Sequence, residues 1–136
     1  MFVGSENVNI EIFYRKNNNG TMKVLRDLEG IAEMDKAKFK KVVLEMKPLT
    51  WKKYNDLQRS SLVSKGPVGA DEIDWYAYKE KKIVSTLVGW DAKDDNGKPI
   101  PVSPDNIFKL HPMIVEMALN EFDRMTLLGE EERKNS

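Results

Sequence analysis

Hydrophobic and polar residues alternate near the start of the chain. A period of two over residues 8–14 is typical of a β-strand with one buried face. The apolar positions of that face are Val8, Ile10, Ile12 and Tyr14. The run of asparagines that ends at Gly20 predicts a tight turn, because asparagine and glycine accept the positive φ of hairpin turns. Residues 21–25 are expected to return as the partner strand, and residues 39–47 to form a third extended segment.

After Pro48 the apolar residues recur at helical spacing. Thr50 is expected to cap this helix, since its hydroxyl can accept a free backbone N–H of the first turn. Trp51, Tyr54 and Leu57 then share one predicted face. We therefore expect Trp51 and Tyr54 to anchor the helix to the core.

A longer apolar stripe predicts the central helix. The stripe runs from Ile73 to Val88 after a glycine- and proline-containing loop over residues 65–70. The helix should start around Asp71, where acidic residues favour the positive end of the helix dipole. Gly89 stands where a left-handed C-cap would end the helix, and Trp90 is expected to anchor the next segment to the core.

The segment after Trp90 contains a turn and two more helix starts. Asn96-Gly97 predicts the turn, and residues 98–102 should be extended because each of two prolines disfavours helix in the residue before it. Ser103 is expected to cap a short helix that begins at Pro104. The last helix should open at Pro112 and stop at Gly129. Its predicted apolar face comprises Ile114, Val115, Ala118, Leu119, Phe122 and Met125.

These elements predict an α+β fold, with a small N-terminal antiparallel β-sheet followed by a mainly α-helical C-terminal bundle. A chain of 136 residues, 40% of them hydrophobic, suits one cored domain over residues 1–136. Residues 8–47 should be the mainly β part and residues 48–129 the mainly helical part. Residues 130–136 have the composition of a polar tail.

Charge and cysteine content narrow the classes of partner and compartment. Basic and acidic residues number 22 each, so no net field steers the protein toward nucleic acid or an anionic membrane. Lysines crowd residues 36–53, which we interpret as a solvated face, with an acidic partner as the alternative. Cysteine is absent, and no segment resembles a secretory signal or a membrane span. We expect a soluble, cytoplasmic protein.

Candidate catalytic and metal-binding residues are few. His111 is the only histidine, and we expect it to pack between two helices or to cap the last one. The acidic turn from Asp91 to Gly97 lacks the bidentate glutamate of a calcium loop. Ser60, Ser61 and Ser85 have no nucleophile-elbow glycines around them, and the chain has no phosphate-binding loop. The sequence therefore predicts a protein that is not an enzyme, with no metal and no cofactor.

Nucleic-acid binding is also disfavoured. Lys52 and Lys53 stand beside Trp51 and Tyr54, and aromatic residues among lysines can stack on bases. The lysines lie off the predicted aromatic face, however, which is typical of a core-facing helix with a solvated back.

Two blocks of the sequence resemble the tail assembly chaperones of tailed bacteriophages. The first block is Met46-Lys47-Pro48-Leu49-Thr50-Trp51, and the second runs from Gly89-Trp90-Asp91 through residues 96–107. The resemblance covers residues 39–127 and corresponds to the short form of the family. It implies a non-enzymatic protein of the host cytoplasm that binds the tape measure protein and assists tail tube assembly. Tail tube subunits are a second implied partner, and self-association stays open.

Binding of a helical client needs exposed apolar side chains, for which methionine is well suited. The expected partner-binding residues lie in the last helix and are Met113, Met117, Phe122 and Met125. The alternative for each methionine is that it fills the core of this domain. The alternative function is that of a permanent structural or adaptor subunit of a phage particle.

Overall fold

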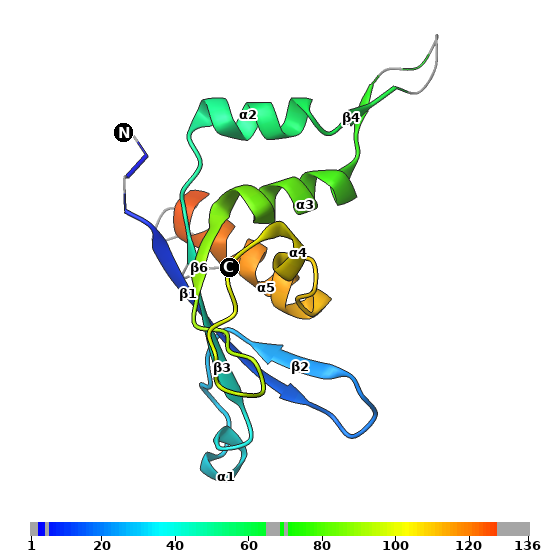
Figure 1. Cartoon of the computed structure of the whole chain (residues 1–136). Helices are drawn as coiled ribbons and strands as arrows, with labels where there is room; N and C mark the ends of the chain where they lie inside the picture. The colour runs from blue at the N-terminus through cyan, green and yellow to red at the C-terminus, as the bar shows by residue number, and fades with distance from the viewer. Residues whose placement is uncertain (1–2, 5, 65–68, 70, 128–136) are drawn as a thin grey trace.

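A four-stranded antiparallel sheet forms the centre of the molecule (Figure 1). The computed structural model describes residues 3–4, 6–64, 69 and 71–127. The strand order is β2-β1-β3-β6. The strands are β1 (Val8–Lys16), β2 (Met22–Leu25), β3 (Lys40–Met46) and β6 (Leu87–Trp90), and the short helix α1 (Glu33–Lys36) lies between β2 and β3.

The three predicted strands and the predicted hairpin are confirmed. Tyr14 of β1 pairs with Val24 of β2, and the turn places Gly20 at a φ of +86°. On the other side of β1, Ile10 pairs with Leu44 of β3. The alternation seen in the sequence places every second side chain on the covered face of the sheet. Ile10, Ile12, Val42, Leu44 and Met46 are all buried there.

The fourth strand corrects the prediction for residues 87–89. The central helix ends at Thr86, and Leu87 continues as β6, which pairs with β3. Gly89 lies opposite Glu45 in this pairing and is not a left-handed C-cap. Leu87 is buried in this strand, and it would also fit the buried face of a helix end. An apolar stripe alone therefore cannot distinguish a helix end from a buried strand. The later half of the chain contributes this strand to the sheet. That half is therefore not a clean helical bundle.

The remaining elements are four helices and two short strands that follow β3 in the chain. Asp74, one of the residues around Asp71 where the helix start was predicted, caps the central helix, because its carboxylate accepts the N–H groups of Tyr76 and Ala77. The caps predicted at Thr50 and Ser103 are confirmed. Much of the loop expected at residues 65–70, the stop at Gly129 and the tail at residues 130–136 lie outside the described residues. The elements are α2 (Trp51–Arg59), β4 (Leu62–Val63), β5 (Glu72–Ile73), α3 (Trp75–Thr86), α4 (Pro104–Ile107) and α5 (Pro112–Leu127).

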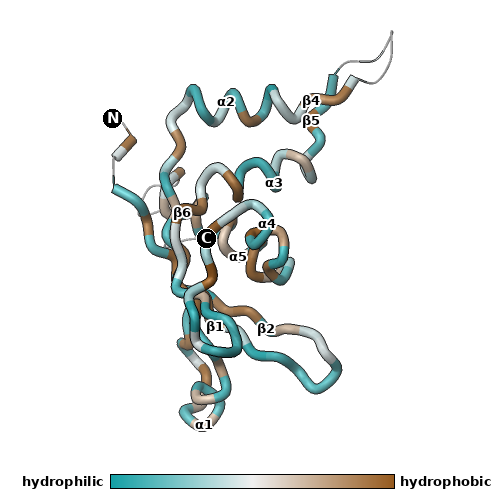
Figure 2. The backbone as a smooth tube through the Cα atoms, in the orientation of Figure 1, coloured by the Kyte–Doolittle hydropathy of each residue, from teal (hydrophilic) through white to brown (hydrophobic). Residues whose placement is uncertain are grey.

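The hydrophobic core lies between the sheet and α5. Helix α5 contacts β1 and β2, and its buried residues are Ile114, Ala118, Leu119 and Phe122. Helix α2 lies on the far side of α3 from the sheet (Figure 1). Apolar residues gather where β6, α4 and α5 approach one another, whereas the tip of the β1–β2 hairpin is hydrophilic (Figure 2). None of the helices in the described part of the chain is both long enough and apolar enough to span a bilayer.

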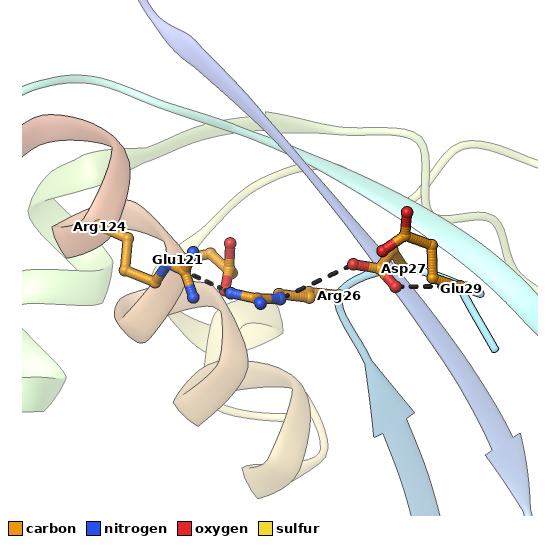
Figure 3. Close-up of polar contacts among 5 residues, drawn as sticks. All are labelled: Arg26, Asp27, Glu29, Glu121 and Arg124. Atoms are coloured by element: carbon orange, nitrogen blue, oxygen red, sulfur yellow. Dashed lines mark hydrogen bonds and ion pairs between the residues drawn. The ribbon is translucent and has the colours of Figure 1, made fainter. Parts of the chain in front are cut away.

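A small ionic network joins the end of β2 to α5 (Figure 3). The guanidinium of Arg26 lies 3.7 Å from Glu121 and 3.8 Å from Asp27. Arg124 lies 3.9 Å from the same Glu121 carboxylate, and the backbone N–H of Glu29 donates to Asp27. The pairs are partly exposed and add little stability.

Candidate functional site

Two apolar hollows lie side by side along α3. The first has a volume of about 300 Å³ and lies between α3, α4 and α5. The second, of about 400 Å³, lies between α2, α3 and α4. Phe108 and Glu80 line both hollows and so form the boundary between them. We call the two hollows and this boundary the trough. Its other apolar lining comprises Leu57, Tyr76, Ile83, Val84, Pro104, Ile107, Leu110, Pro112 and Val115.

The shortness of α4 explains why the trough has an exposed aromatic boundary. Ser103 caps the helix and Pro104 opens it, but it ends at Ile107 after one turn. Ile107 is buried in the core and attaches the turn to it. Phe108 follows at the C-cap and remains 57% exposed. Adjacent residues of a helical turn cannot both face the core, so burying Ile107 forces Phe108 outward.

Charged residues of both signs line the trough. Lys79 of α3 pairs with Glu116 of α5 at 3.0 Å across the first hollow. The ammonium of Lys81 donates to the carbonyl of Ser60. Glu80 lies between these lysines in sequence and is exposed, yet within the described residues it has no hydrogen-bond or ion-pair partner. Lys79 and Lys81 line the trough together with Glu80 and Glu116, so its charged lining is balanced.

A buried cation connects the three longer helices. Lys82 of α3 is only 4% exposed, and its ammonium lies 2.7 Å from Asp123 of α5. The same ammonium lies 5.5 Å and 5.4 Å from the ring centroids of Tyr54 in α2 and Tyr78 in α3. The Tyr78 hydroxyl is buried without a hydrogen-bond partner in the described residues. Burial raises the pKa of this phenol above its usual value.

The predicted partner-binding residues do not form one surface. Phe122 is 2% exposed and belongs to the core, so its assignment to a partner-binding surface is wrong. Met117 is partly buried against the same core. Met113 and Met125 are exposed, but they lie twelve residues apart on α5, about 18 Å along the helix axis. Neither of these two methionines lines the trough.

The three residues predicted to anchor the helices to the core differ in their burial. Trp51 is 80% exposed, so its assignment to the core is wrong. Six helical positions separate it from the buried Leu57, which turns it about 120° away from the packed face. Tyr54 is half-buried and contacts Tyr78 edge to face. Trp90 is half-buried against the core, and its indole N–H donates to the carbonyl of Ile100 at 2.5 Å.

The polar residues considered for chemistry act as caps and turn formers. His111 Nδ1 accepts the backbone N–H of Met113 at 3.2 Å, which corresponds to the capping alternative. Asp94 accepts the N–H groups of Asn96 and Lys98, and Gly97 has a φ of +78°. In the described part of the chain, no three histidine or acidic side chains are grouped as metal ligands.

Comparison with known proteins gives no family. The chain matches no protein-family model, no curated protein and no solved structure.

Sequence reasoning missed the residues that build the trough. Tyr76 falls within the apolar stripe that predicts the central helix, but it is exposed in the first turn of α3. Phe108 and Glu80 carried no motif. The adjacent apolar pair Ile107-Phe108 in a short helix was the available signal, because only one of the two can face the core.

Proposed function

We propose that this chain is a non-enzymatic assembly chaperone of a tailed bacteriophage, which binds the tape measure protein through the trough. The observation that carries the proposal is that Phe108 and Tyr76, two exposed aromatic residues, line the trough. Contiguous exposed apolar patches typically mark protein interaction sites. Such a surface suits a protein whose task is to cover apolar segments of another chain.

The sequence blocks that resemble the chaperone family support this proposal by their position. The first block covers the end of β3, the cap at Thr50 and the start of α2. The second begins in β6 and ends with α4, whose last residue adjoins Phe108. The second block thus leads directly into the boundary of the trough. In this proposal the protein acts in the host cytoplasm and assists the addition of tail tube subunits.

Co-expression with the tape measure protein tests the proposed function. We expect the tape measure protein to remain in solution and to co-purify with the chain, and to aggregate when expressed alone. The proposal would be contradicted if neither protein co-purified with the other.

Mass spectrometry of purified phage particles separates the chaperone from the permanent structural or adaptor subunit. A chaperone is absent from the finished particle, whereas a subunit is present at a defined copy number. Detection of the chain at the copy number of a tail component would replace the proposed function by the alternative.

A further inference from the structure

The end of the sheet where β1 turns into β2 is strongly basic. Four cations lie there without a carboxylate partner in the described part of the chain, namely Arg15, Lys16, Lys23 and Lys40. The strand register brings them together, because Arg15 of β1 pairs with Lys23 of β2, and the adjacent Tyr14 pairs with Lys40 of β3. The same end is the hydrophilic tip of the hairpin in Figure 2.

The arrangement of these cations costs stability. Like charges directly opposite one another on paired strands destabilise a sheet, and Arg15 lies directly opposite Lys23. Farther along the sheet opposite charges meet, since Lys41 of β3 lies 3.7 Å from Glu11 of β1. A lysine on the edge strand β2 prevents edge-to-edge aggregation. That role does not account for Arg15 and Lys16, because β1 lies between β2 and β3.

The hairpin turn borders a polar hollow of about 620 Å³. We call it the hairpin hollow, and its lining comprises Arg15, Lys16, Asn17, Asn18 and Lys38. Three of these five residues are cations and none is acidic. Asp35 lies 3.3 Å from Lys38 and compensates that charge, so Arg15 and Lys16 are the two lining cations that a ligand can neutralise. This lining favours an anionic group over an apolar side chain.

The cations of the hairpin hollow are held on a well-defined support. The guanidinium of Arg15 lies over the ring of Phe39, 5.1 Å from its centroid. In the turn, the backbone N–H of Asn17 donates to the carbonyl of Thr21 at 2.8 Å, and the Asn17 side-chain amide donates to the Thr21 hydroxyl at 2.9 Å. Groups that are already fixed lose little conformational entropy on binding. A guanidinium held in this way can bind both oxygens of one carboxylate.

Protein carboxylates suit the hairpin hollow better than nucleic acid does. Single strands bind to aromatic side chains that stack on the bases. No aromatic residue lines the hollow, and the neighbouring Phe39 has the guanidinium of Arg15 over its ring. The chain has no net charge, so it lacks the broad positive field that attracts a duplex.

We propose that the hairpin hollow binds an acidic segment of a partner protein through Arg15 and Lys16. The inference does not rest on the proposed function, because the hairpin hollow shares no lining residue with the trough. The hairpin also extends away from the helices (Figure 1). The protein therefore has a second contact surface, which recognises charge and not apolar side chains.

Short peptides test this inference with the full chain. A peptide of alternating glutamate and glycine is compared with peptides in which glutamine or lysine replaces every glutamate. Fluorescence anisotropy at low ionic strength should show binding of the glutamate peptide alone. Its Kd should rise with added salt, because the contacts join solvent-exposed charges. Equal affinity for the glutamate and glutamine peptides would overturn the inference.

Removal of the two cations shows whether binding occurs in the hairpin hollow. Arg15→Gln/Lys16→Gln should weaken binding of the glutamate peptide by about tenfold or more, as expected for lost charge-assisted hydrogen bonds. Lys53→Gln/Lys109→Gln is the matched control. It removes the same net charge at two exposed lysines that do not line the hairpin hollow, and it should bind like the wild type.

An equal loss of affinity in both double variants would overturn the inference, because binding would then depend on net charge alone. Circular dichroism melts identify any variant that fails to fold. Lys16→Gln alone keeps the test valid in that case, because Lys16 is exposed and has no ion-pair partner in the described residues. It should still weaken binding of the glutamate peptide.

Two further results would replace the proposed ligand. Tighter binding of single-stranded oligothymidine than of the glutamate peptide at the same salt concentration, with the same loss in Arg15→Gln/Lys16→Gln, would assign the hairpin hollow to nucleic acid. Self-association that the glutamate peptide prevents, and that this double variant lacks, would assign the hollow to acidic residues of a second copy of this chain.

Discussion

Lys82 holds a positive charge almost entirely out of water, and Asp123 is its ionic partner. Removing the partner leaves the ammonium near two tyrosine rings but without a carboxylate. We expect Asp123→Ala to lower the free energy of unfolding by about 2 kcal/mol, less than for a fully buried pair because Asp123 is 40% exposed.

Lys82→Met is the matched comparison for this pair, since methionine fills similar space without a charge. Its free energy of unfolding should stay within about 1 kcal/mol of the wild type. Urea denaturation of both variants measures the difference. Equal losses in the two variants would show that the ion pair itself stabilises the fold, and would contradict the expectation that the cost of Asp123→Ala comes from an unpaired buried charge.

Tyr78 offers a second test at the residue scale. Its hydroxyl is buried without a partner in the described residues, so Tyr78→Phe should raise the free energy of unfolding by about 1 kcal/mol. The pKa of Tyr78 is raised, chiefly by burial. Above a pH of about 10 the unfolded chain therefore ionises before the folded chain does, and stability falls as pH rises.

The advantage of Tyr78→Phe should consequently grow above that pH. Denaturation curves at neutral and alkaline pH measure both effects in the same variant. A loss of stability in Tyr78→Phe at neutral pH would mean that the hydroxyl makes a stabilising contact in the folded protein.

At the scale of elements, periodicity predicted the strands that alternate and missed the strand that does not. Strands β1 and β3 alternate clearly because α5 covers only one face of the sheet. Strand β6 has only four residues, and its Leu87 falls in register with the stripe of α3. Pairing with the free edge of β3 decides its conformation, and this edge is a tertiary feature that a local pattern does not contain.

Two glycines distinguish the strand from the helix cap that the sequence predicted. Gly97 has a positive φ in its turn, so Gly97→Ala should cost about 1 kcal/mol. Gly89 lies in a strand, and an added Cβ would meet the end of the Glu45 side chain at 2.7 Å. Because that carboxylate can turn away, we expect Gly89→Ala to cost less than Gly97→Ala. The melting temperatures of the two variants test this order. A larger loss of stability in Gly89→Ala than in Gly97→Ala would favour a left-handed C-cap at Gly89.

The candidate site was less predictable than the fold for a related reason. Helical spacing identifies an apolar face but not which part of it a neighbouring helix covers. Phe122 was buried by the sheet, whereas Phe108 remained exposed because α4 is only one turn long. The trough depends on the relative placement of four helices, which no single stretch of sequence specifies.

At the scale of the whole molecule, the sheet and the helices have separate tasks. The sheet and α5 bury most of the core, and the four helices α2 to α5 shape the trough on their outer side. A client that binds the trough would cover Phe108 without disturbing the sheet. Substitutions in the trough should therefore change binding far more than stability, and the opposite should hold for the core.

The most direct test compares Phe108→Glu with Met34→Glu for binding of the tape measure protein. Both wild-type residues are exposed, Phe108 in the trough at 57% and Met34 in α1 at 78%. Isothermal titration calorimetry should show at least about a tenfold loss of affinity for Phe108→Glu, as expected of a central aromatic contact. Met34→Glu should bind the tape measure protein as tightly as the wild type does. Both variants should have the melting temperature of the wild type. Unchanged affinity in Phe108→Glu would contradict the assignment of partner binding to the trough.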